Sequence, residues 1–320
     1  DFIISIDFFS TYLYNNIIKI IKGNHFMRFR HYNKAIVPVI IAVFILRYAE
    51  LSFLLEPGTA YYKTGDFYHY IFYIIYALAA IFFFMAYFFL PAKNCGGYIF
   101  ENAAVYKYTS FFIPGFFLAV GSVIKLYQGF TSSDIIKFSY YFRTIDFYIN
   151  IFSLIAAIAL ILFSASAEKK LFKTTFFKVI IISLPISYIL RLFDIYIESE
   201  EVALKTFGSF EVLKVAFMSL CLMSFSKIFI STCKRKNFTI TLWLASIFTV
   251  VRVADMIFAL INNQLNLMSI DIFYQIADAD LILSLLFINT LLYKKRRRKI
   301  KKTDYNLTQM ENNGEEKGSI

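Results

Sequence analysis

The sequence has few charged residues, which excludes an ordinary water-soluble globular protein. Charged side chains make up 17% of the 320 residues, whereas hydrophobic residues make up 59% and aromatic residues 20%. A soluble domain has roughly 25% charged residues, because its surface must be largely polar. Lipid is therefore the expected solvent for much of this chain.

Cysteine and histidine are also scarce. Cys95, Cys221 and Cys233 are an odd number of thiols without the spacing of metal ligands, so neither a disulfide framework nor a zinc site is supported. The three histidines include His69, which lies near the end of an apolar run and could titrate near neutral pH, although interfacial histidines commonly have no such role. We expect no metal and no cofactor.

The common enzymatic motifs are absent from the sequence. It contains no HExxH, no G-x-S-x-G, no P-loop and no glycine-rich dinucleotide fingerprint. The last apolar run has no lysine deep within it, which argues against a retinal Schiff base. The enzymatic alternative that stays open is an intramembrane enzyme that uses aspartates alone, but we expect no catalytic residues.

Long apolar runs are abundant and predict an all-α, polytopic membrane protein. About 20 apolar residues are needed to cross a bilayer as a helix. Reading the runs between polar breaks gives about eight transmembrane helices within a domain of residues 27–302. The expected spans are 35–55, 67–90, 110–128, 142–167, 179–197, 209–230, 239–261 and 270–293.

The basic residues predict the orientation of these spans. The net charge of +11 does not indicate a nucleic-acid partner, because the basic residues cluster in alternate short loops beside the spans, as topology determinants do. The alternate loops on the opposite side are richer in acids and tyrosines. We therefore expect a multi-pass protein of the cytoplasmic membrane with both termini in the cytosol. The expected cytosolic basic residues are Arg28, Arg30, Lys34, Lys93, Lys107, Lys169, Lys170, Lys173, Lys178, Lys234, Arg235 and Lys236.

Both ends of the chain differ from the apolar domain. Residues 1–26 contain no methionine, and Met27 precedes the first apolar run, so we interpret 1–26 as a non-native upstream extension or a short leader. The composition fits an AT-rich bacterial genome, in which Lys22 and Gly23 could be encoded by a ribosome-binding-like sequence. We expect a true start at Met27.

The C-terminal basic run, Lys294–Lys302, is predicted to stop the last helix against anionic lipid headgroups. Each basic residue near such a surface contributes about 1 kcal/mol. Residues 303–320 are polar and are predicted to form a disordered cytosolic tail. Docking of a protein partner through this tail is an alternative to simple anchoring.

The odd-numbered spans share a local pattern that predicts an internal repeat. A basic residue is followed three positions later by an acid or an amide, and a second span follows after a short loop. The chain is therefore expected to contain four parallel helical hairpins, at about 35–91, 109–167, 179–230 and 239–293. The four pairs are Arg47 with Glu50, Lys125 with Gln128, Arg191 with Asp194, and Arg252 with Asp255.

Ionisable residues within the spans are the candidate functional residues, because such residues normally face the interior of a bundle or a wet cavity. Positions three apart share a helix face, so local ion pairs are expected. Both signs are present in similar numbers, which argues against an ion-selective ring of one charge. The predicted polar network or solute site comprises Arg47, Glu50, Lys125, Gln128, Asp146, Arg191, Asp194, Glu211, Lys214, Arg252, Asp255 and Asp278.

Two functional interpretations follow from these charges. The first is an outward-opening cavity that binds or transports a small polar or charged solute, with Asp278 as the best candidate for a cation or proton site. The second is a membrane sensor or accessory subunit that acts through an unidentified cytosolic partner. A purely structural alternative is that the charges only hold the hairpins together, as interhelical polar contacts do.

Overall fold

The computed structural model describes residues 25–56, 62–63, 68–90, 111–131, 144–165, 174–201, 208–230, 232–264 and 271–290. The regular elements among these residues are helices, and eight of them are long and apolar enough to cross a membrane. They are α2 (His25–Leu54), α3 (Tyr68–Phe89), α5 (Phe112–Phe130), α7 (Ile145–Ala165), α8 (Thr175–Glu201), α9 (Gly208–Phe229), α10 (Arg235–Ile261) and the last helix (Ile272–Thr290).

The eight predicted spans are confirmed, with differences at their ends. Helix α2 starts at His25 and α8 at Thr175, both earlier than the apolar runs alone indicate. Pro38 and Pro185 lie inside these two helices, where neighbouring helices can compensate for a missing backbone hydrogen bond. Pro114 lies in the first turn of α5, where its missing N–H costs little. Eight such helices are typical of a multi-pass membrane protein. The kind of membrane and the side on which the termini lie remain predictions from the sequence.

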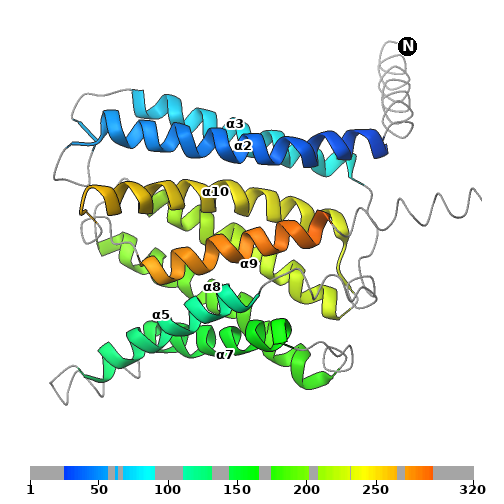
Figure 1. Ribbon diagram of the computed structural model, residues 1–320, viewed down its shortest axis with the longest axis vertical. Coiled ribbons are helices and arrows are strands. Elements are labelled where there is room, and N and C mark those ends of the chain that lie inside the picture. The colour runs from blue at the N-terminus through cyan, green and yellow to red at the C-terminus, as the bar shows by residue number, and fades with distance from the viewer. Residues whose placement is uncertain are drawn as a thin grey trace, which may run out of the picture.

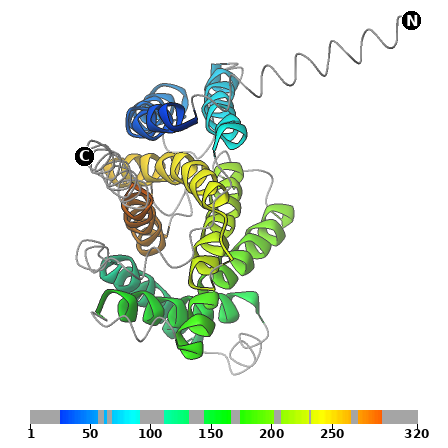
Figure 2. The ribbon, with the colours of Figure 1, turned by 90° about the vertical axis from the view of Figure 1, so that its right-hand side faces the viewer.

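The helices form an elongated bundle in which they run roughly side by side (Figure 1). Helices α2 and α3 lie at one side of the bundle, α5 and α7 lie at the other, and α8, α9, α10 and the last helix lie between them (Figure 2). Helix α10 packs against α2, α3 and α9, while α7 packs against both α5 and α8. Successive helices α2–α3, α5–α7 and α8–α9 pack as hairpins, but a fourfold repeat stays a prediction.

Large apolar side chains form the core on both sides of α10. One cluster joins α2, α3 and α10 around Trp243, whose ring centroid lies 5.4 Å from that of Phe83. A second cluster, which includes Phe163 and Phe225, fills the space among α5, α7, α8, α9 and the last helix. Many other aromatic and aliphatic residues are exposed on the bundle surface, as expected for side chains that face lipid.

Gly115 allows α5 to approach α7 closely. A Cβ atom at this position would lie 2.9 Å from Ile161 Cγ1 and 3.0 Å from the carbonyl oxygen of Ala157. Small residues at helix interfaces permit such backbone approach in membranes. We expect Gly115→Ala to lower the free energy of unfolding by about 1–3 kcal/mol, because α5 must shift away from α7. Unfolding in mixed detergent micelles measures this change.

Val123→Ala is the matched control, since Val123 lies on the exposed side of the same helix. Its effect on stability should be small, because both side chains are apolar and face lipid. Equal stability of Gly115→Ala and the parent protein would contradict the close contact between α5 and α7.

Candidate functional site

The intramembrane charges gather toward one end of the bundle, which we name the Leu54 end. Helices α2, α8 and α10 finish at this end, and α9 and the last helix start there. Arg47, Arg191 and Arg252 lie about two to three turns before the ends of their helices. Glu211 and Asp278 lie within about two turns of the starts of theirs. The alternating helix directions therefore place these residues at similar depth.

Helices α2 and α10 contribute a fully buried group of ion pairs. Arg47 Nη1 lies 2.9 Å from Glu50 Oε2, and Arg47 Nε lies 2.6 Å from Asp255 Oδ1. Arg252 Nη1 lies 2.9 Å from the other oxygen of Asp255. The local pairs predicted in the first and fourth hairpins are thus present, and Arg47 and Asp255 join them.

Two tyrosines complete the surroundings of Glu50. Tyr76 Oη donates a hydrogen bond to Glu50 Oε2 at 2.8 Å, and the Tyr62 hydroxyl donates to Glu50 Oε1. Tyr62 lies between α2 and α3 and accepts a hydrogen bond from Arg47 Nη1 at 2.9 Å. Burial raises the pKa of the Tyr62 hydroxyl well above its ordinary value, so this group stays a donor. The Arg47 guanidinium also lies over the ring of Phe210, 4.7 Å from its centroid.

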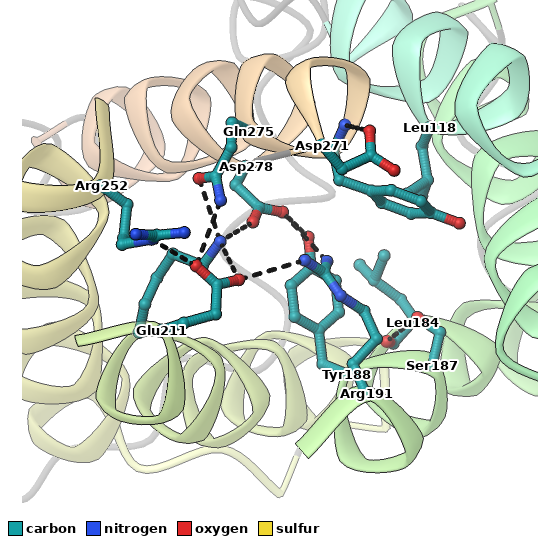
Figure 3. A network of polar contacts seen from close by, with 12 residues as sticks. Leu118, Leu184, Ser187, Tyr188, Arg191, Glu211, Arg252, Asp271, Gln275 and Asp278 are labelled. Atoms are coloured by element: carbon teal, nitrogen blue, oxygen red, sulfur yellow. Dashed lines mark hydrogen bonds and ion pairs between the residues drawn. The ribbon is translucent and has the colours of Figure 1, made fainter. Parts of the chain in front are cut away.

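Glu211 on α9 connects this group to the centre of the bundle (Figure 3). Its Oε2 lies 2.6 Å from Arg252 Nε, and its Oε1 lies 2.7 Å from Lys214 Nζ. Lys214 Nζ also lies 2.8 Å from Asp278 Oδ2 and donates to Gln275 Oε1 at 3.1 Å. Gln275 Nε2 in turn donates to Glu211 Oε2 at 3.1 Å. Glu211 therefore has close contacts both to a cation of its own helix and to a cation of α10.

Arg191 on α8 is held differently from the other cations. Its guanidinium nitrogens lie 3.6 Å from Glu211 Oε1 and 3.5 Å from Asp278 Oδ1, which are longer separations than in the other ion pairs of this group. Its Cζ lies 4.9 Å from the ring centroid of Tyr188 and 4.7 Å from that of Tyr274. The Tyr188 hydroxyl donates to Asp278 (Figure 3). Arg191 is thus held by aromatic faces and by long ion pairs.

These contacts form one continuous set of residues from five helices, which we name the charge network. It comprises four cations and four carboxylates, so its formal charge is zero. A mixed network was predicted, and each contact within it joins opposite charges. Its members are Arg47, Glu50, Arg191, Glu211, Lys214, Arg252, Asp255 and Asp278.

Lys125 lies beside the charge network and pairs with an acid that the repeat did not predict. Its Nζ lies 3.2 Å from Asp271 Oδ2, with 43% and 29% of the two side chains exposed. Its Nζ also lies 5.1 Å from the ring centroid of Tyr274. The Tyr274 hydroxyl donates to Asn150 Oδ1 at 2.9 Å and lies 3.1 Å from the Ser122 hydroxyl. Tyr274 therefore lies between Lys125 and Arg191.

Besides Lys125, three residues of the predicted site are not among the eight members of the charge network. Gln128 is exposed on α5, and Lys125, three positions before it, contacts Asp271. Asp146 is exposed in the first turn of α7. Asp194 is half-buried on α8. The His69 side chain, the basic run at 294–302 and the tail lie outside the described residues, so the interpretations placed on them stay untested.

The sequence pattern did not identify the tyrosines that contact the charge network. Tyr188 lies three residues before Arg191, and Tyr274 lies four residues before Asp278, so both pairs share a helix face. That spacing is a weak signal, because the chain contains 23 tyrosines. Tyr62 and Tyr76 have no such signal, since their partner Glu50 belongs to another helix.

The donor set of the described residues contains no group of three or more histidines, cysteines or acids that could hold a metal ion. The carboxylates of the charge network are instead occupied by arginine and lysine. No protein-family model, curated protein or solved structure matches this chain.

Proposed function

We propose that this protein binds a small polar or charged solute within the membrane and moves it across, with Arg191 and Glu211 as the contact residues. The observation that carries the proposal is the partial exposure of these two residues within an otherwise buried network. The side chains of Arg191 and Glu211 are 12% and 15% exposed, whereas those of Arg47, Glu50, Lys214, Asp255 and Asp278 are fully buried.

The energetics favour Arg191 as the residue that changes partners. Its contacts to Glu211 and Asp278 are longer than hydrogen-bonding distance, so they are weaker than the close pairs made by Lys214. The Tyr188 and Tyr274 rings would still hold the guanidinium if these contacts opened. A solute anion can therefore replace an acid at Arg191 without dismantling the rest of the charge network.

Arg191 and Glu211, the partly exposed residues of the charge network, have opposite charges, which favours a zwitterionic solute. Its anionic group would contact Arg191 and its cationic group would contact Glu211, so the network would stay neutral when the solute binds. A solute of one sign would leave an uncompensated charge in the bundle, which is costly in a medium of low dielectric constant.

Chemical modification of a cysteine placed at position 211 tests whether water and solutes reach Arg191 and Glu211. The native cysteines are first replaced by serine, and Glu211→Cys is then treated with 2-sulfonatoethyl methanethiosulfonate, a charged reagent that must arrive through water. We expect modification to restore a negative charge and to recover thermal stability lost in the variant. The cationic trimethylammonioethyl reagent should modify the same thiol without recovery.

Ser219→Cys is the matched control, because Ser219 is buried and lies further along the same helix. It should react at least about tenfold more slowly than Glu211→Cys. Trimethylglycine should raise the unfolding midpoint of the parent protein more than tetramethylammonium or methanesulfonate does, and Arg191→Gln should remove this stabilisation. Equally slow reaction at positions 211 and 219 would contradict a water-accessible solute site.

A further inference from the structure

Asp280 is a second acid of the last helix, and it lies near the middle of the span. The helix runs from Ile272 to Thr290, so Asp280 is about 12 Å along the axis from its first residue. Asp278, the member of the charge network on this helix, and Gln275, which contacts Lys214, lie closer to the start of the helix. Asp280 is therefore expected close to the centre of the hydrocarbon layer.

Asp280 is half-buried and lies at the edge of the outer face of the last helix. Asp280, Leu283 and Phe287 are spaced three and seven residues apart, so they share one face. Leu283 is 64% exposed and Phe287 is 39% exposed. Ala277 and Ser284, which flank Asp280 on its other side, are buried, as are Asp278 and Leu281. One side of the last helix lies at the bundle surface (Figure 2), so Asp280 lies at the boundary between the lipid-facing side and the buried side of this helix.

Within the described part of the chain, Asp280 has no hydrogen-bond donor at its buried oxygen Oδ2. Four cations of the elements around the last helix contact other acids. Lys125 of α5 contacts Asp271, and both Arg191 of α8 and Lys214 of α9 contact Asp278. Arg252 of α10 contacts Glu211 and Asp255.

We propose that Asp280 is a proton-binding site within the bilayer, separate from the charge network. An ionised carboxylate at this place would be half-buried at mid-span with an oxygen that accepts no hydrogen bond, whereas a bound proton removes its charge. The bound proton also turns the carboxylate into a carboxylic acid of low polarity, which suits an apolar surface. The ligand is a single proton, and the site does not depend on the solute proposed for Arg191 and Glu211.

An apolar carbodiimide tests this proposal, because it dissolves in lipid and reacts with protonated carboxyl groups. A carboxyl oxygen bonds to the central carbon of dicyclohexylcarbodiimide and the acid proton passes to a nitrogen. The O-acylisourea then rearranges to an N-acylurea, so the whole reagent is retained. We expect mass spectrometry of the full-length protein in proteoliposomes to find one adduct on the peptide that contains Asp280, with labelling that declines as the pH rises.

Variants separate this site from the other acids. Asp280→Asn should abolish the adduct while the protein stays folded, and Asp280→Glu should keep it. Asp271 and Asp278, which have cationic partners, should be free of reagent in the same digest. Absence of an adduct on Asp280, or labelling that does not change with pH, would overturn the proposal. Labelling by a water-soluble carbodiimide with an amine nucleophile, but not by the apolar reagent, would overturn it as well.

Discussion

Replacing Arg47 with methionine is expected to destabilise the protein by about 3–5 kcal/mol. Arg47 is the cation that contacts Glu50, and it also contacts Asp255, while both acids are fully buried. Methionine has a similar length but no charge, so Glu50 would be left with only the hydroxyl groups of Tyr62 and Tyr76. Titration with a denaturing detergent, followed by far-ultraviolet circular dichroism, measures the loss.

A second substitution separates loss of charge balance from loss of packing. Arg47→Met combined with Glu50→Gln removes one charge of each sign, so the double variant should recover a substantial part of the lost stability. Lys63→Met is a control for the loss of a basic side chain, because Lys63 is exposed. A double variant as unstable as Arg47→Met alone would show that packing, and not charge, determines the effect.

Replacing Phe83 with alanine is expected to cost about 3 kcal/mol, because it opens a cavity between α3 and α10. Phe83 is fully buried and its ring packs against that of Trp243. Trp243 is the single tryptophan of the chain, so its emission reports directly on this contact. The emission maximum should shift when the ring of Phe83 is removed, and the unfolding midpoint should fall.

The adjacent residue provides the comparison for this change. Phe84 is half-exposed on the surface of the same helix, so Phe84→Ala exchanges one lipid-facing apolar side chain for another. Its unfolding midpoint and tryptophan emission should stay close to those of the parent protein. Similar losses at positions 83 and 84 would be inconsistent with the packing of α3 against α10.

The spans could be predicted from the sequence because the requirement for about 20 apolar residues is local. The pairs Arg47–Glu50 and Arg252–Asp255 could also be predicted, since helical geometry alone brings residues three apart together. The contact of Lys125 with Asp271 could not be predicted by this rule, because Asp271 lies on a helix distant in sequence.

Contacts between helices could not be derived from a single sequence. The joining of Arg47 to Asp255, and of Lys214 to Asp278, depends on which helices become neighbours and on their rotation. The aromatic surroundings of Arg191 depend on the same packing. Helical geometry alone, in contrast, predicts that Asp278 and Asp280 lie on different faces of the last helix, because they are two residues apart.

The pairing of Arg47 with Asp255 has a consequence for biosynthesis, because the two residues are 208 positions apart in the chain. As translation proceeds, α2 enters the membrane long before α10 has been made. Glu50, one turn away, neutralises the arginine during that interval. Helix α2 therefore carries its own counter-ion into the bilayer and acquires a second one only when α10 arrives, so a chain truncated before α10 keeps Arg47 only partly satisfied.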